Sequence, residues 1–130
     1  MFKKVTIIGL GLIGSSMARG IKEQGLADML VAADRDQGVC DKVTALGIAD
    51  VATASLEEGV RDSDLVVLAV PVGVIEDVGK DIAPFLKPEA IVTDTGSVKQ
   101  SVIDSLKPAL PESVHLVPAH PIAGTEFSGP

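Results

Sequence analysis

The amino-acid sequence predicts an α/β fold in which helices cover both faces of a doubly wound parallel sheet. Short runs of branched apolar residues alternate with segments of helical periodicity along the chain. Hydrophobic residues make up 46% of the sequence and aromatic residues only 2%, and small branched side chains suit helices packed closely on a buried sheet. The length of 130 residues suits a single domain.

The first half of the chain is expected to form two strand–helix units and a short further strand. The branched run Val5–Ile8 is typical of a fully buried strand, and Gly25 is well placed to end the helix that follows it. Gly47 has the same place after the second helix. The expected elements, in order, are strand Val5–Ile8, helix Leu12–Gln24, strand Met29–Ala33, helix Gln37–Leu46 and strand Ile48–Val51.

The second half continues the alternation. Ser55 and Glu58 form a capping-box pattern for a short helix, and Ser97 with Gln100 indicates another helix start. His115 lies inside an apolar strand and is interpreted as structural. The remaining expected elements are strand Leu65–Val70, helix Gly73–Phe85, strand Ala90–Thr93 and strand Val114–Val117, after which Pro118–Pro130 shows neither period.

Composition and charge exclude several functional classes. The net charge is −7 without a basic patch, which argues against nucleic-acid binding. Cys40 is the one cysteine, so no internal disulfide can form; a reducing, cytoplasmic setting is expected, with Cys40 as a small buried residue. No stretch is long and apolar enough to span a membrane, and the glycine-interrupted N-terminus is not read as a secretory signal. No metal-ligand set is assigned.

A glycine-rich turn after the first strand predicts a dinucleotide site. Gly9, Gly11 and Gly14 form G-x-G-x-x-G between a predicted strand and a predicted helix. The first glycine permits a tight turn, the second lets the backbone reach a pyrophosphate, and the third lets helix and strand pack closely. Leu12 and Ile13 open the helix whose N-terminus would face the phosphates, and they are assigned to the same site. The fold is therefore expected to be of the Rossmann type.

The acidic residue at the end of the second strand favours NAD. Asp34 lies twenty positions after Gly14, where its carboxylate can accept hydrogen bonds from both ribose hydroxyls and repel a 2′-phosphate. Arg35 could instead hold a 2′-phosphate, so NADP stays possible, although Asp36 beside it weakens that option. The alternative interpretation is that the glycines serve only turn formation and packing.

Three further strand ends lie at the same expected edge of the sheet. Val70 and Pro71 would run past the cofactor, because ligands of such sheets lie beyond the carboxyl ends of the strands. An ordinary strand-to-helix turn explains these two residues equally well. The other two strand ends carry polar segments, Asp94-Thr-Gly-Ser-Val-Lys99 and Ala119-His-Pro-Ile-Ala-Gly-Thr-Glu126.

With these segments the chain resembles the prephenate and arogenate dehydrogenases of tyrosine biosynthesis. The resemblance covers essentially the whole chain and is carried by Gly9-Leu-Gly-Leu-Ile-Gly14, Asp94-Thr-Gly-Ser-Val-Lys99 and His120-Pro-Ile-Ala-Gly-Thr-Glu126. It implies an NAD-dependent oxidative decarboxylation. Hydride leaves the ring carbon that bears the hydroxyl, and the ring carboxylate departs as CO2.

The resemblance also implies roles for residues near the end of the chain. His120 matches the histidine that takes the proton of the ring hydroxyl, and a neutral imidazole, with an ordinary pKa of about 6.5, suits that role. Ser97 matches a serine near the nicotinamide and the substrate, although it is also a good helix cap. Thr125 and Glu126 match residues at the substrate pocket, where Glu126 could equally be a solvated loop acid.

The family carries a second, mostly helical domain that forms the homodimer and supplies cations for the substrate carboxylates. None of it is recognised in residues 1–130, so we expect a dinucleotide-binding domain, truncated after the histidine loop, with little turnover of its own. The competing hypotheses are a β-hydroxyacid dehydrogenase or imine reductase with the same cofactor domain, and a non-catalytic NAD-binding module. The choice between prephenate and arogenate stays open at this stage.

Overall fold

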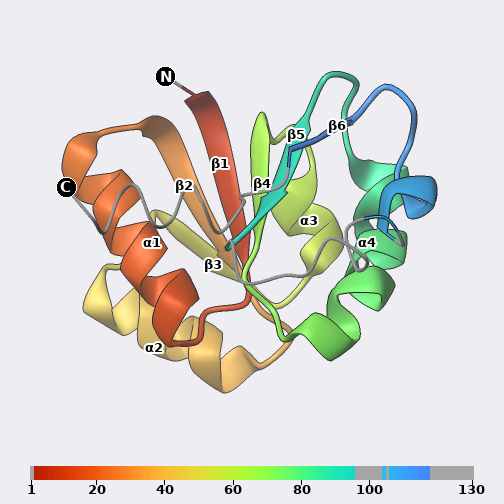
Figure 1. The fold of residues 1–130 in the computed structure, drawn as a ribbon. Helices are drawn as coiled ribbons and strands as arrows, with labels where there is room; N and C mark the ends of the chain where they lie inside the picture. Colours follow the sequence, from red (N-terminus) through yellow and green to blue (C-terminus); the bar gives the residue numbers. More distant parts are fainter. Residues whose placement is uncertain (1, 96–103, 105, 118–130) are drawn as a thin grey trace, which may run out of the picture.

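The computed structural model describes residues 2–95, 104 and 106–117. Within these ranges the chain forms a parallel sheet of six strands in the order β3-β2-β1-β4-β5-β6 (Figure 1). The strands are β1 (Phe2–Ile8), β2 (Ala27–Ala33), β3 (Val51–Thr53), β4 (Leu65–Leu68), β5 (Ile91–Asp94) and β6 (His115–Leu116). This all-parallel order, with its reversal beside β1, confirms the Rossmann-type doubly wound sheet.

Helices cover both faces of the sheet and form three layers with it (Figure 1). The α-helices are α1 (Leu12–Gln24), α2 (Gln37–Leu46), α3 (Leu56–Val60) and α4 (Ile75–Ile82), with short 3-10 helices η1 (Val72–Val74), η2 (Ala83–Phe85) and η3 (Lys107–Ala109). Side chains of α1 and α2 pack in one hydrophobic cluster, and those of α3 and α4 pack in a second one.

Alternating side chains of the central strands divide the core between these two clusters. Val5 and Ile7 of β1 belong to the α1–α2 cluster, whereas Ile8 belongs to the α3–α4 cluster. Thr6 also faces α3, where its hydroxyl donates to the carbonyl of Gly59 at 2.5 Å and lies 2.7 Å from the Ser63 hydroxyl. A sheet buried on both faces explains why the sequence shows continuous apolar runs here rather than alternation.

The first two helices begin and end where the sequence predicts. Gly25 and Gly47 follow them in the left-handed conformation, and each donates its backbone N–H to carbonyls of the preceding turn. Asp36 caps the start of α2, since its carboxylate accepts from the backbone N–H of Gly38 and of Val39. None of the helices in the described part of the chain has the length and apolar character needed to span a bilayer.

The third and fourth strands differ from their predicted ranges for reasons that the hydrogen bonds show. The third strand was expected at Ile48–Val51 but lies at Val51–Thr53, because the N–H of Ile48 is still bonded to the carbonyl of Val43 at the end of α2. The fourth strand ends at Leu68 rather than Val70. Its neighbour β1 ends at Ile8, whose carbonyl takes a last hydrogen bond from Ala69, so Val70 has no strand beside it to continue the ladder.

The predicted helix Gly73–Phe85 is divided into η1, α4 and η2. Pro84 explains the change at the C-terminal end: it has no N–H to donate to the carbonyl of Lys80, so an α-helical ladder cannot continue through it. The first strand begins three residues earlier than expected, at Phe2 rather than Val5, and the bounds of β2, β5 and β6 shift by one or two residues. The helix expected to begin near Ser97 lies outside the described residues.

Candidate functional site

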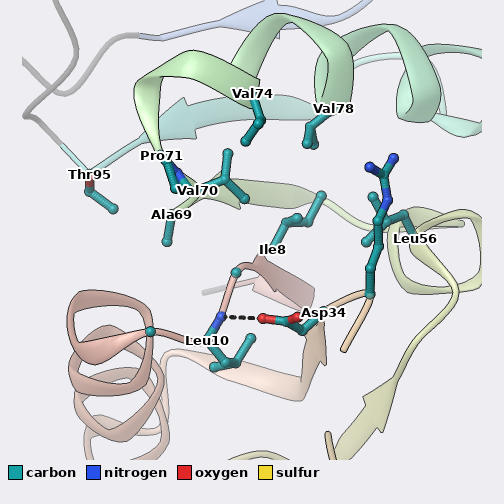
Figure 2. Close-up of a pocket in the computed structure, with 13 residues that line it drawn as sticks. Ile8, Leu10, Asp34, Leu56, Ala69, Val70, Pro71, Val74, Val78 and Thr95 are labelled. Atoms are coloured by element: carbon teal, nitrogen blue, oxygen red, sulfur yellow. Dashed lines mark hydrogen bonds between the residues drawn. The ribbon is translucent and has the colours of Figure 1, made fainter. Parts of the chain in front are cut away.

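A cleft of about 690 Å³ opens at the carboxyl end of the sheet, lined by residues that follow β1, β2, β4 and β5. The chain passes from β1 to α1 on one face of the sheet and from the adjacent β4 to α4 on the other face. The cleft therefore lies where the strand order reverses and the connecting helices change faces. Ligands of doubly wound sheets bind at such a point. The cleft is lined by Ile8, Gly9, Leu10, Gly11, Asp34, Arg35, Leu56, Ala69, Val70, Pro71, Val74, Val78 and Thr95 (Figure 2).

The three glycines of the turn have three different environments. Gly9 has a φ of +92°, and a Cβ there would lie 2.7 Å from the carbonyl oxygen of Ala69. A Cβ on Gly14 would lie 2.0 Å from the carbonyl oxygen of Gly9, so only glycine allows α1 to lie this close to the turn. A Cβ on Gly11 would meet nothing within 4 Å. Gly9 and Gly14 are needed by the fold itself, whereas Gly11 keeps a space next to the backbone open.

That open space lies at the N-terminus of α1. Gly11 is the N-cap residue and has no side chain to bond the first helical amides. The first N–H groups of a helix have no partner within the helix and carry a partial positive charge, which suits an anion. Leu12 and Ile13 are the first residues of α1, so their backbone N–H groups are among those at this end of the helix. The turn therefore fits the phosphates of a dinucleotide.

Asp34 is held in place by two backbone amides at the end of β2. One carboxylate oxygen accepts from the N–H of Leu10 at 3.0 Å (Figure 2). The other accepts from the N–H of Asp36 at 2.9 Å. Each carboxylate oxygen can accept a second hydrogen bond. The side chain lines the cleft and is only partly buried, so it presents a fixed acceptor next to the glycine turn.

Arg35 lines the same cleft and forms an ion pair with Asp81 of α4. Its neighbour Asp36 uses its carboxylate to cap α2. The side chains of the three consecutive residues therefore have different partners, although the sequence alone suggested only that Asp36 opposes Arg35.

Val70 and Pro71, which follow β4, line the cleft. Val74 and Val78 continue this wall along η1 and α4 (Figure 2). Sequence reasoning missed both valines, because their helical spacing indicated only a buried face.

Further lining residues that were not assigned include Leu56 and Thr95. Leu56 comes from the start of α3, and nothing in the sequence links that helix to the glycine turn. Thr95 directly follows β5, so its position at a strand end was a usable signal.

Four predicted site residues, Ser97, His120, Thr125 and Glu126, lie outside the described residues. His115 is described, and it lies in β6 with its imidazole exposed and 2.6 Å from the carboxylate of Glu89. It is not among the residues that line the cleft.

Comparison with known proteins identifies the family. The family described as "Prephenate dehydrogenase, nucleotide-binding domain" matches residues 17–130. The cyclohexadienyl dehydrogenase of Zymomonas mobilis is 47% identical over 131 residues, which cover 100% of this chain and 44% of that protein.

Solved structures agree. A. aeolicus prephenate dehydrogenase, in complex with hydroxyphenyl propionate and NAD+, superposes with a TM-score of 0.82 at 32% identity, covering 96% of this chain and 43% of that one. The arogenate dehydrogenase of Synechocystis gives a TM-score of 0.75 at 30% identity, covering 82% of this chain and 37% of that one. The chain thus spans less than half the length of these relatives. The chain belongs to the family of prephenate dehydrogenase nucleotide-binding domains.

Proposed function

We propose that the chain binds NAD(H) in the cleft and forms the cofactor-binding part of an enzyme that oxidatively decarboxylates prephenate or arogenate. The observation that carries the proposal is the glycine turn, where Gly9 and Gly14 are required by close packing and Gly11 leaves room beside the α1 N-terminus. A relative with the same fold, at 32% identity, was solved with NAD+. A relative of 47% identity is named cyclohexadienyl dehydrogenase.

Each part of the cleft has its own task in this proposal. The amides at the start of α1 hold the pyrophosphate, together with the turn from Gly9 to Gly14. Asp34 accepts hydrogen bonds from the ribose hydroxyls, and its two backbone partners keep its carboxylate in position for them. Val70 and Pro71 provide an apolar wall along the cleft.

The chemical step is assigned to residues known from sequence only. NAD+, when bound, supplies the hydride acceptor. His120 accepts the proton of the ring hydroxyl as hydride leaves the ring carbon that bears this hydroxyl, and the ring carboxylate leaves as CO2. By the resemblance to the family, Ser97 is assigned a role beside the substrate and the nicotinamide, and Thr125 and Glu126 a role in binding the substrate. A homodimer formed by a further helical domain and a reducing, cytoplasmic compartment belong to the same proposal.

A nucleotide titration tests the binding part. NADH fluorescence or calorimetry on the 130-residue chain should show saturable binding, and Gly11→Ala should weaken it about tenfold or more, because overpacking a close contact commonly costs about 1–3 kcal/mol. The same variant should unfold at nearly the wild-type urea concentration, since the added methyl meets nothing in the fold. No binding at millimolar NADH would disprove the proposal.

Turnover of the full-length protein tests the chemical part. His120→Asn should lower kcat with prephenate or arogenate by at least about 10²-fold, because general-base assistance is typically worth about 10²–10⁴. NADH binding should stay at the wild-type level. Near-normal turnover in this variant would refute the role of His120. A preference for β-hydroxyacids or imines in the same assay would move the enzyme to a different reaction.

A further inference from the structure

An ion pair joins the two sides of the cleft at its adenosine side, where Asp34 marks the ribose site of the proposed function. Arg35 follows β2 and lines the cleft, and its guanidinium pairs with the carboxylate of Asp81 on α4. The two residues lie 46 positions apart in the sequence. Both side chains are more than half exposed, at 59% and 54%, so the pair lies in contact with solvent and can exchange partners.

Helical geometry explains why Asp81 reaches this place. Val74 and Val78 line the cleft, and Asp81 lies seven and three positions after them. At about 100° per residue, Asp81 lies about 60° around α4 from Val78 and about one turn beyond it, so the two residues share one side of the helix. Asp81 therefore extends the cleft-facing side of α4 outward with a negative charge.

Arg35 is the cation that a 2′-phosphate would need. It lies directly after Asp34, which we assign to the ribose, and an arginine nearby is the usual means of binding the phosphate of NADP. A 2′-phosphate would have to displace Asp81 from the guanidinium. The carboxylate of Asp36, on the other side, is already engaged by the first amides of α2.

We propose that Asp81 is a positioning residue that disfavours 2′-phosphorylated cofactors by holding Arg35 on α4. NAD(H) has no phosphate at this position and does not need the guanidinium, so its binding is unaffected by the pair. The proposal rests on the proposed NAD(H) site and adds to it a determinant that lies outside the glycine motif and outside the β2–α2 loop. Selectivity against NADP then comes from two carboxylates, Asp34 by repulsion and Asp81 by occupying the cation.

The test is a set of titrations of the 130-residue chain with NADH and with NADPH, at about 0.15 M salt. Asp81→Asn should tighten NADPH binding about two- to fivefold, because the 2′-phosphate would no longer compete with the Asp81 carboxylate for Arg35. The gain is small because exposed ion pairs are of modest strength. NADH affinity should not change. Glu76→Gln is the matched control: it removes the same charge from α4, from a pair with Lys80, about 140° around the helix from Asp81. This control should leave the NADPH-to-NADH affinity ratio at its wild-type value.

Arg35→Gln distinguishes positioning from simple charge repulsion. If Asp81 acts through Arg35, Asp81→Asn has no effect on NADPH binding in the Arg35→Gln background. An equal effect in both backgrounds would overturn the proposal, since Asp81 would then act directly on the phosphate. An unchanged or weakened NADPH affinity in Asp81→Asn alone would overturn it as well. Loss of NADH binding in the wild-type chain would instead disprove the nucleotide site itself, and this inference with it.

Discussion

At the residue scale, different glycines of the turn serve folding and binding. Gly9 and Gly14 meet backbone atoms that cannot move aside, whereas Gly11 faces open space. The same motif thus contains two positions where an added methyl group disturbs the protein and one where it disturbs only a bound molecule. Gly9 is required because the chain after β4 passes close to it at Ala69, and Gly14 because α1 lies close to the carbonyl of Gly9.

Gly14→Ala is expected to lower the free energy of unfolding by about 1–3 kcal/mol, because its methyl group would overlap the carbonyl of Gly9. Urea unfolding measures the change. Gly20→Ala is the control in the same helix. A Cβ there meets nothing within 4 Å, so the substitution should raise stability by about 0.5–1 kcal/mol. Equal effects of the two substitutions would contradict the packing argument.

At the element scale, Asp64 connects the starts of three neighbouring strands. Its carboxylate accepts from the Lys87 ammonium and from the backbone amides of Lys3 and Lys4, the latter two at 2.7 and 3.2 Å. The backbone of Asp64 also bonds to Lys4 and Ile91. Asp64 therefore joins β1, β4 and β5 at the edge of the sheet opposite the cleft.

The hydrogen bond from Lys87, followed by those from Lys3 and Lys4, lowers the pKa of Asp64 from 3.8 to about 2. The lowered pKa means that the ionised carboxylate stabilises the fold above about pH 4 and that this contribution is lost as the pH falls towards 2. We expect Asp64→Asn to be less stable than the wild type at pH 6, with the difference shrinking below pH 4. Urea unfolding at several pH values measures it.

Asp62→Asn is the matched control for this prediction. Asp62 is an exposed neighbour with a φ of 62°, a conformation that asparagine also tolerates, so the substitution removes the same charge without strain. Its effect should not follow the pH dependence of Asp64→Asn. A stability difference for Asp64→Asn that stays constant from pH 6 to pH 2 would show that the carboxylate is not stabilised by its partners.

At the scale of the whole molecule, two hydrophobic clusters lie on opposite faces of one sheet and the cleft opens at its carboxyl edge. The reactivity of the Cys40 thiol is a probe of whether this fold is closed. This thiol is buried and donates to the carbonyl of Asp34 at 3.2 Å, and burial raises its pKa. A buried thiol of raised pKa reacts slowly with disulfide reagents, so labelling of Cys40 requires opening of the fold.

We expect the native chain to react with such a reagent much more slowly than the urea-unfolded chain. NADH bound to the folded state should slow the reaction further, by about 100-fold at a concentration 100 times its Kd, because ligand binding lowers the population of the open state. The measurement is the absorbance of the thiol that the reagent releases on reacting with Cys40, and its rate is determined at several NADH concentrations. A labelling rate independent of NADH would show that Cys40 is exposed by a local motion that the nucleotide does not oppose.

The sequence by itself determined the layout of the chain and the family. Periodicity predicted α1 and α2 with their ends, because a glycine stops each helix locally, and it predicted the parallel sheet from continuous apolar runs. The predicted bounds of strands were wrong where a neighbouring segment of the fold determines where strand pairing begins or ends. Val70 reads as strand but leaves the sheet because β1, its partner strand, has already ended. The roles of Ser97 and His120 stay predictions, since both lie outside the described residues.

Only the tertiary structure decided which side chains share the cleft. Val78 and Leu56 line it from helices that the sequence does not connect to the glycine turn, and Asp81 pairs with Arg35 across 46 positions. The physical reason is range. Turns, caps and periodicity depend on residues a few positions apart, which a sequence displays directly, whereas pairings between separate strands and helices depend on how the whole sheet folds.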